Sequence, residues 1–168
     1  MHQRKTAIRS FYANLLTFEH YYEEKWFPYT MPISDIYGLR AALENVKADR
    51  EQLKRHAILA KAVRETLAEA GLSLYLEDGF SSSVTVFEVP EGLTDRQIID
   101  TMTEKYHIMI AGCFDVLAGK VLRIGHMGNN ANAADLADTM EALQGTLTNL
   151  GFAVKCDMRK RFEEKICG

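Results

Sequence analysis

The residue best placed to do chemistry in this chain is an arginine inside a short apolar run. Arg123 stands in residues 119–128, GKVLRIGHMG, a pattern typical of a tight turn, a buried strand and a glycine-lined loop. Burying a lone guanidinium is costly, whereas its planar fork can hold a carboxylate through two parallel hydrogen bonds. Two interpretations follow: Arg123 binds the carboxylate of a ligand, or it forms an internal salt bridge with one of the 23 acidic side chains.

A second candidate lies in a segment framed by two prolines. Pro28 and Pro32 bracket Tyr29, Thr30 and Met31. Because proline disfavours helix at the residue before it, we expect this segment to be extended. The hydroxyl and backbone N–H of Thr30 could then bind a phosphate, although a solvated loop threonine would have the same sequence around it.

The remaining polar residues give weaker indications. His126, in the glycine-lined loop, either lies near a bound anion or is an exposed loop histidine, and we favour the exposed histidine. The run Ser81-Ser82-Ser83 has no glycine-rich turn leading into a helix, so a polar hairpin turn is expected. The histidines and cysteines show no metal-ligand spacing, and no metal site is expected.

The bulk properties exclude several classes of function. The chain has 168 residues, 47% of them apolar, and a net charge of −3 with interspersed signs. No basic stripe indicates nucleic-acid binding, and no apolar run approaches the ~18 residues that would span a membrane. The three cysteines are an odd number and indicate reduced thiols in a cytoplasmic protein.

Apolar residues recur at helical spacing in four stretches, which predict four helices. Ser34 is expected to cap the first, and Gly71 to end the second, unless the two form one long bent helix. Thr94 and Gln97 form a capping box in front of the third. Gly151 stops the fourth. The helices are expected over residues 34–46, 53–70, 94–106 and 132–150.

Four short apolar stretches between these helices predict strands. They cover residues 72–76, 84–89, 108–111 and 120–124. From about residue 50 onward the order α-β-β-α-β-β-α predicts an α+β fold, a small antiparallel sheet with helices on one face. Residues 8–25 are rich in aromatics and predict one or two helices, while the tail after residue 151 receives no assignment.

Taken in order, several segments resemble the class V pyridoxal-phosphate aminotransferases, the alanine–glyoxylate and serine–pyruvate group. The resemblance covers roughly residues 10–150, and each segment is modest alone whereas the ordered set is specific. The segments are residues 27–33 (FPYTMPI), 36–43 (IYGLRAAL), 55–56 (RH), 84–86 (VTV), 90–92 (PEG), 110–112 (IAG) and 119–128.

This resemblance implies a fold type I enzyme, in which a large α/β domain carries pyridoxal phosphate on a lysine and a small C-terminal domain closes over the site. It implies a homodimer with active sites at the interface. Arg123 would bind the carboxylate of an amino acid or 2-oxo acid, and Thr30 the cofactor phosphate of the neighbouring subunit. Family members often have a tyrosine where Phe27 stands, so that phosphate contact would be absent here or be supplied by Tyr29.

The chain departs from the family at its front. The family's Schiff-base lysine lies well upstream of the threonine segment, and only 29 residues precede Thr30. By this comparison residues 1–48 are a remnant of the large domain with a linking helix, and residues 49–168 are the C-terminal small domain. No catalytic residue is then present, and we expect the chain alone to bind pyridoxal phosphate weakly and not to transaminate.

Several origins would explain such a chain: a truncated reading frame, one half of a split gene, or a separately produced small domain. Its partners would be a second copy or the missing large domain. The alternative is a free-standing α+β module that binds an amino acid at Arg123, or associates with a partner, without catalysis.

Overall fold

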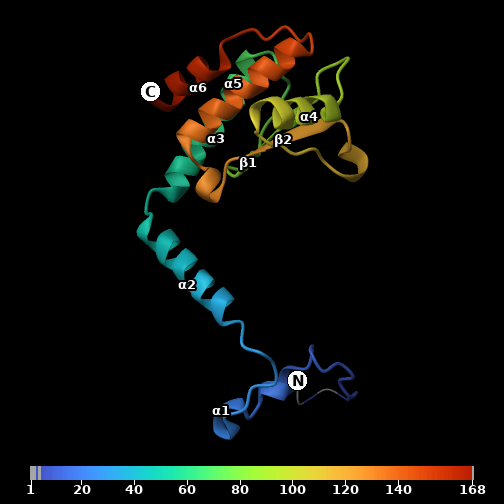
Figure 1. The fold of residues 1–168 in the computed structure, drawn as a ribbon, viewed down its shortest axis with the longest axis vertical. Coiled ribbons are helices and arrows are strands. Elements are labelled where there is room, and N and C mark those ends of the chain that lie inside the picture. The colour runs from blue at the N-terminus through green and yellow to red at the C-terminus, as the bar shows by residue number, and fades with distance from the viewer. Residues whose placement is uncertain (1–2, 4, 168) are drawn as a thin grey trace. The chain divides into compact units, whose positions relative to one another are not determined.

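A computed structural model describes residue 3 and residues 5–167 of the chain. The chain forms two compact units, Met1–Asp49 and Arg50–Gly168 (Figure 1). The second unit contains the sheet and most of the helices. That the first unit is a piece of a large domain stays a prediction.

The sheet of the second unit has two regular strands. β1 (Val84–Glu88) and β2 (Val121–Gly125) pair antiparallel, with Val86 opposite Arg123. The predicted strands over residues 72–76 and 108–111 are reduced to single antiparallel bridges, Leu74 to Phe87 and Ala111 to Arg123. The outer segments therefore lie where the sequence predicts them, but they leave the sheet after one pair.

Alternate residues of the two strands point to opposite faces of the sheet. Phe87, Leu122 and Ile124 are buried and belong to the hydrophobic core, whereas Val86 and Arg123 are half-buried on the other face. One face of the sheet therefore supplies the core, and Arg123 lies on the opposite face.

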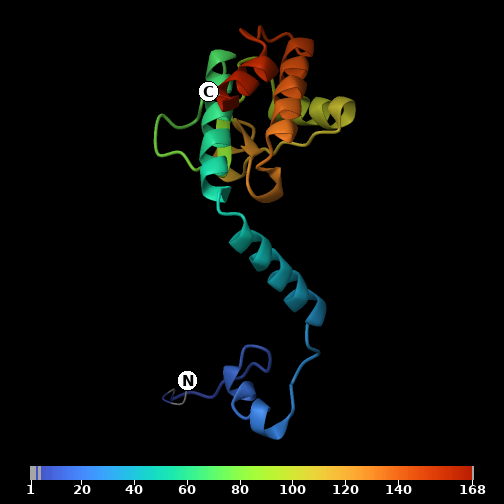
Figure 2. The same ribbon diagram turned by 90° about the vertical axis from the view of Figure 1, so that its left-hand side faces the viewer.

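Among its described residues the second unit also has four α-helices, and two views at right angles show their arrangement (Figure 1, Figure 2). α3 packs against β1, α5 and α6, while α4 packs against α5. All four contribute apolar side chains to the same core cluster as the strands. The predicted α+β architecture, an antiparallel sheet with helices, is confirmed. The helices are α3 (Gln52–Glu69), α4 (Asp95–Tyr106), α5 (Ala133–Asn149) and α6 (Met158–Cys167).

Three of the four predicted capping residues lie at the ends of helices as the sequence predicts. The Thr94 side chain accepts a hydrogen bond from the backbone of Gln97, whose own side chain accepts one from the backbone of Thr94. Gly71 and Gly151 follow α3 and α5 with φ of +92° and +88°. These left-handed conformations favour glycine, so the predicted ends of both helices are confirmed.

α6 is the element that sequence analysis missed. Its Met158 and Phe162 are fully buried, and Lys165 Nζ lies 2.7 Å from Glu69 Oε1 of α3. The signal was present in the sequence, because Met158, Phe162 and Ile166 recur every four residues. Asp157 precedes the helix and accepts a hydrogen bond from the backbone N–H of Lys160.

The described residues of the first unit form three helical segments, η1 (Leu15–Phe18), α1 (Tyr21–Glu24) and α2 (Ile33–Ala48). Two of these are single turns, so the aromatic stretch makes only short helices. α2 begins at Ile33 with no side-chain cap, and the predicted cap at Ser34 is wrong because Ser34 lies inside the first turn. α2 ends at Ala48 and α3 begins at Gln52, so the two are separate helices.

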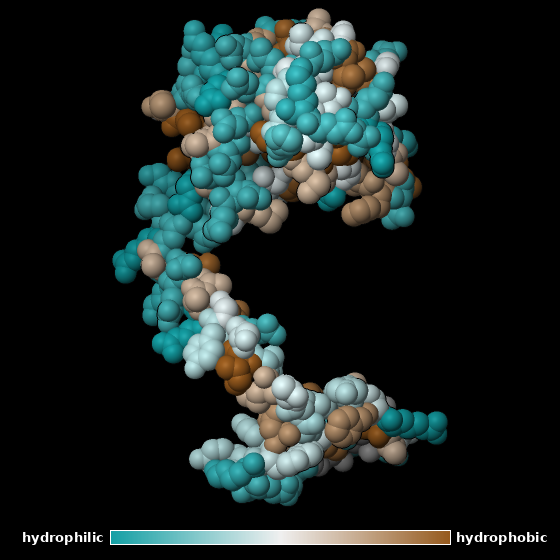
Figure 3. All heavy atoms as spheres, in the orientation of Figure 1, coloured by the Kyte–Doolittle hydropathy of each residue, from teal (hydrophilic) through white to brown (hydrophobic). Residues whose placement is uncertain are grey.

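No described residue of the first unit is buried. Hydrophobic side chains are visible at the surface along α2 in Figure 3. The large apolar residues that α2 exposes are Ile33, Ile36, Tyr37, Leu39, Leu43 and Val46. Within the described part of the chain, no helix is long and apolar enough to cross a membrane.

Candidate carboxylate-binding site

Residues 111–114 hold both the backbone and the side chain of Arg123. The backbone N–H of Arg123 donates to the carbonyl of Ala111 over 2.7 Å, and the Ala111 N–H donates back over 3.1 Å. The Arg123 Nε donates to the carbonyl of Gly112 over 2.8 Å. The Cζ of the guanidinium lies 5.2 Å from the ring centroid of Phe114, within the range of a cation–π contact.

No carboxylate among the described residues forms an ion pair with Arg123. The internal salt bridge considered from the sequence is therefore wrong for this part of the chain. Only Nε of the guanidinium has a hydrogen-bond partner within the described structure. Its Nη1 and Nη2 groups remain for a ligand, and they form the fork that a carboxylate fits.

The backbone conformation of the loop that holds Arg123 is restricted at several positions. A Cβ on Gly112 would lie 3.2 Å from Asp95 Oδ2 and 3.7 Å from Ile99 Cδ1, so a larger residue would push on α4. Asp115 adopts a φ of +49°, a left-handed conformation that aspartate tolerates better than most residues. Gly119, with φ of +73°, then turns the chain into β2.

His126 is fully buried, so the favoured interpretation of an exposed loop histidine is wrong. Its Nδ1 donates to the carbonyl of Ser82 over 3.2 Å, since a carbonyl can only accept. Nε2 then accepts from the Thr85 hydroxyl over 2.8 Å. Burial lowers the pKa of His126, with smaller opposing effects from backbone hydrogen bonds. His126 therefore ties the serine turn to the end of β2 as a neutral side chain.

The glycine-lined loop after β2 is anchored to α3. His56 Nε2 accepts from the backbone N–H of Gly128 over 3.1 Å, and its Nδ1 donates to the carbonyl of Gln52 over 2.6 Å. Arg55 Nε donates to the carbonyl of Ala131 over 3.1 Å. Residues 55–56 were noted in the sequence only as part of the family resemblance, and the anchoring contacts join residues more than 70 positions apart.

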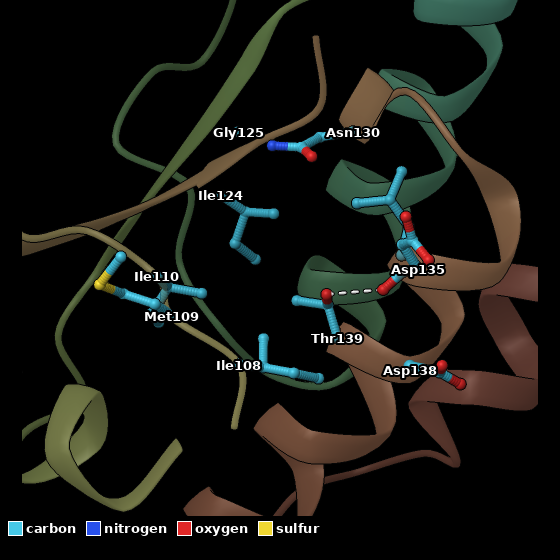
Figure 4. A pocket seen from close by; sticks show the side chains of 10 residues that line it. Ile108, Met109, Ile110, Ile124, Gly125, Asn130, Asp135, Asp138 and Thr139 are labelled. Carbon is cyan, nitrogen blue, oxygen red and sulfur yellow. Dashed lines mark hydrogen bonds between the residues drawn. The ribbon is translucent and has the colours of Figure 1, made fainter. Parts of the chain in front are cut away.

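Beside the end of β2 lies a hollow of about 280 Å³. In Figure 4, Ile108, Ile110 and Ile124 face Asp135 and Thr139 of α5. The Thr139 hydroxyl donates to the backbone carbonyl of Asp135 over 2.7 Å, so it is already satisfied. Arg123 does not line this hollow. No group of three or more histidine, cysteine or acidic side chains among the described residues is arranged to hold a metal ion.

The two predicted phosphate-binding residues lie in the first unit, apart in sequence from Arg123. Thr30 is exposed, and no hydrogen bond of its side chain occurs among the described residues. Tyr29 is half-buried, and its hydroxyl donates to the carbonyl of Phe11 over 3.0 Å. The Tyr29 ring contacts other aromatic rings, with centroids 5.2 to 6.2 Å away: Phe11, Tyr12, Phe18 and Phe27.

Several known proteins similar to this chain are aminotransferases. An uncharacterized aminotransferase of Methanocaldococcus jannaschii is 40% identical over 149 residues, which cover 86% of this chain and 38% of that protein. A serine–glyoxylate aminotransferase of Arabidopsis thaliana is 32% identical over 133 residues, covering 77% of this chain and 33% of that protein. No protein-family model matches the chain.

A solved structure supports the same relationship. The pyridoxamine–pyruvate aminotransferase of Mesorhizobium loti superposes with a TM-score of 0.80 and 25% identity, over 91% of this chain and 41% of that protein. The chain belongs to the class V aminotransferases, and the extent of the match is that expected of a C-terminal portion. The matched part covers between 33% and 41% of the length of these relatives.

Proposed function

We propose that this chain is the C-terminal part of a pyridoxal-phosphate-dependent aminotransferase that transfers an amino group between a small amino acid and a 2-oxo acid. In this proposal Arg123 binds the substrate carboxylate. The observation that carries it is the guanidinium on the face of β2 opposite the core, held through Nε while its Nη groups have no partner among the described residues. The aminotransferase relatives support the reaction class.

The residues present do not make a complete pyridoxal phosphate site. Thr30 offers a hydroxyl for the phosphate, whereas the hydroxyl of Tyr29 is already used by Phe11. Of the two lysines before Thr30, Lys25 lies over the Tyr22 ring at 3.9 Å, and neither Lys25 nor Lys5 follows a strand. In such enzymes the cofactor serves as an electron sink and its lysine is needed for the proton transfers. We infer that this lysine lies outside these 168 residues and that they do not transaminate alone.

The exposed apolar surface of the first unit supports an assembly with more polypeptide. Neither the aromatic cluster around Tyr29 nor α2 buries any side chain within its own unit. Large uncovered apolar patches are uncommon on monomeric proteins. We infer that the large domain of the same enzyme, in a homodimer, covers this surface.

Two measurements, ligand affinity and amino transfer, distinguish this proposal from the alternative of a free-standing amino-acid-binding module. Calorimetry with alanine, serine and pyruvate should give millimolar or weaker binding to the chain alone, because one charge-assisted contact contributes only about 1.5–3 kcal/mol. No amino transfer to pyruvate or glyoxylate should be detected. Micromolar binding that is lost in Arg123→Ala would instead favour a free-standing binding module, and amino transfer by the purified chain would contradict the proposal.

A positive test uses a chimera. Residues of this chain replace the matching C-terminal part of the Arabidopsis serine–glyoxylate aminotransferase. If the chimera folds, it should transfer amino groups, and Arg123→Ala should lower kcat/KM about 10- to 100-fold while Arg123→Lys loses less. A chimera whose activity is indifferent to Arg123→Ala would contradict the role given to Arg123.

A further inference from the structure

The guanidinium of Arg123 has two flat faces and three N–H edges, and the fold occupies some of them. The carbonyl of Gly112 takes the Nε edge at 2.8 Å. The ring of Phe114 lies against the guanidinium, 5.2 Å from Cζ to the ring centroid. What remains is the pair of Nη groups, which donate in the plane of the fork.

Packing does not account for Phe114. The side chain is 71% exposed and does not belong to the hydrophobic core cluster. Its ring contacts Arg123, and Phe114 stands immediately before Asp115, whose left-handed φ of +49° sets the turn at this point of the loop. The loop therefore holds an exposed aromatic ring next to the guanidinium of Arg123.

We propose that Phe114 is a positioning residue for carboxylate binding by Arg123, which deepens the proposed function and rests on it. The negative face of an aromatic ring attracts the guanidinium and leaves the Nη edge free. The ring also displaces water from part of the cation, which strengthens its attraction to an anion. Phe114 and the Gly112 carbonyl together hold the fork in one orientation, so that less freedom is lost when a carboxylate binds.

Matched variants separate the aromatic contact from apolar bulk. Phe114→Tyr keeps a ring of the same kind, whereas Phe114→Leu keeps an apolar side chain without one. The whole chain is labelled with nitrogen-15, and the Nε–Hε resonance of Arg123 is assigned by its disappearance in Arg123→Lys. Hydrogen exchange of Hε and the shift of this resonance during a pyruvate titration are then measured, with the backbone amide spectrum as a check on folding.

We expect Phe114→Tyr to match the parent chain. Phe114→Leu should speed the exchange of Hε and weaken pyruvate binding about two- to fivefold, the size of an exposed cation–π contact. Unchanged pyruvate affinity in Phe114→Leu overturns the inference and leaves the proposed function standing. No pyruvate-dependent shift in the parent chain overturns the inference, because no carboxylate would then be positioned, and it leaves the proposed function standing, since that function requires only millimolar or weaker binding by the chain alone. Equal loss in Phe114→Tyr and Phe114→Leu overturns the aromatic role alone.

Discussion

The two units of this chain contain similar kinds of residue but differ in how far their apolar side chains are buried. The second unit buries apolar side chains from four helices and a sheet in one core. The first unit has aromatic residues in abundance and buries none of its described side chains. The difference teaches that apolar content alone does not make a domain, because elements must also be present to cover each other's apolar faces.

Two helices make the same comparison at nearly equal length. α2 has 16 residues and α5 has 17. Leu39 and Leu43 lie on the apolar stripe of α2 and are 61% and 59% exposed, whereas Leu143 and Leu147 of α5 are fully buried. Helical periodicity predicted both helices equally well. It identifies the apolar face of a helix, but it does not show whether another element packs against that face.

The largest effect expected from this difference is in amide hydrogen exchange of the whole chain. Amides in α5 should exchange at least about 10³-fold more slowly than unprotected ones, because opening them requires global unfolding of the core. Amides in α2 should exchange nearly as fast as in an unstructured peptide, since short helices without packing are marginal in water. Comparable protection of both helices, persisting on dilution, would break the comparison.

Two leucine substitutions test the same difference between α2 and α5 through the free energy of unfolding. Leu143→Ala should lower the free energy of unfolding by about 2–5 kcal/mol, through lost burial and the cavity that remains. Leu43→Ala, its matched control in α2, should change it by less than about 0.5 kcal/mol. Urea unfolding followed by circular dichroism gives both values, and equal losses would show that Leu43 is covered in solution.

A smaller effect concerns pH and only the second unit. Burial lowers the pKa of His126 in the folded chain below the ~6.5 of an unfolded histidine. Below about pH 6.5 the unfolded chain therefore takes up a proton that the folded chain does not, and stability falls as pH falls, by at most about 1.4 kcal/mol per pH unit. The contribution is fully present above that pH.

Variants isolate this contribution in urea unfolding between pH 7.5 and 5. His126→Gln should flatten the pH dependence, whereas His107→Asn, at an exposed position with left-handed φ, should leave it unchanged. If His126→Gln retained the full pH dependence, the buried neutral histidine would not be its source.

Much of the second unit could be predicted because its signals are local. The capping box at Thr94, the glycines that end α3 and α5, and an arginine in an apolar strand can be identified from a few neighbouring residues. Other features depend on distant partners. The serine turn and Thr85 enclose His126, so the burial of this histidine could not be derived from nearby sequence. The apolar periodicity of α6 is local, whereas its burial by α3 and α5 depends on distant residues.

The candidate site likewise has one feature that local sequence predicts and others that depend on distant residues. The sequence singled out Arg123, whereas the contacts from Gly112 and Phe114 come from a loop eleven and nine positions earlier along the chain. The pairing of Tyr29 with Phe11 was likewise invisible, because it joins residues 18 positions apart. Spacing along the chain identifies the reactive group, and only the fold identifies what orients it.

The most direct test of the central claim, that Arg123 is present without the lysine that holds the cofactor, is a trapping experiment. The chain is incubated with pyridoxal phosphate, reduced with borohydride, and mapped for modified lysines by mass spectrometry. We expect weak labelling scattered over exposed lysines, with no defined absorbance band before reduction. Stoichiometric labelling of a single lysine would contradict it and would require the chain to be assayed as a complete enzyme.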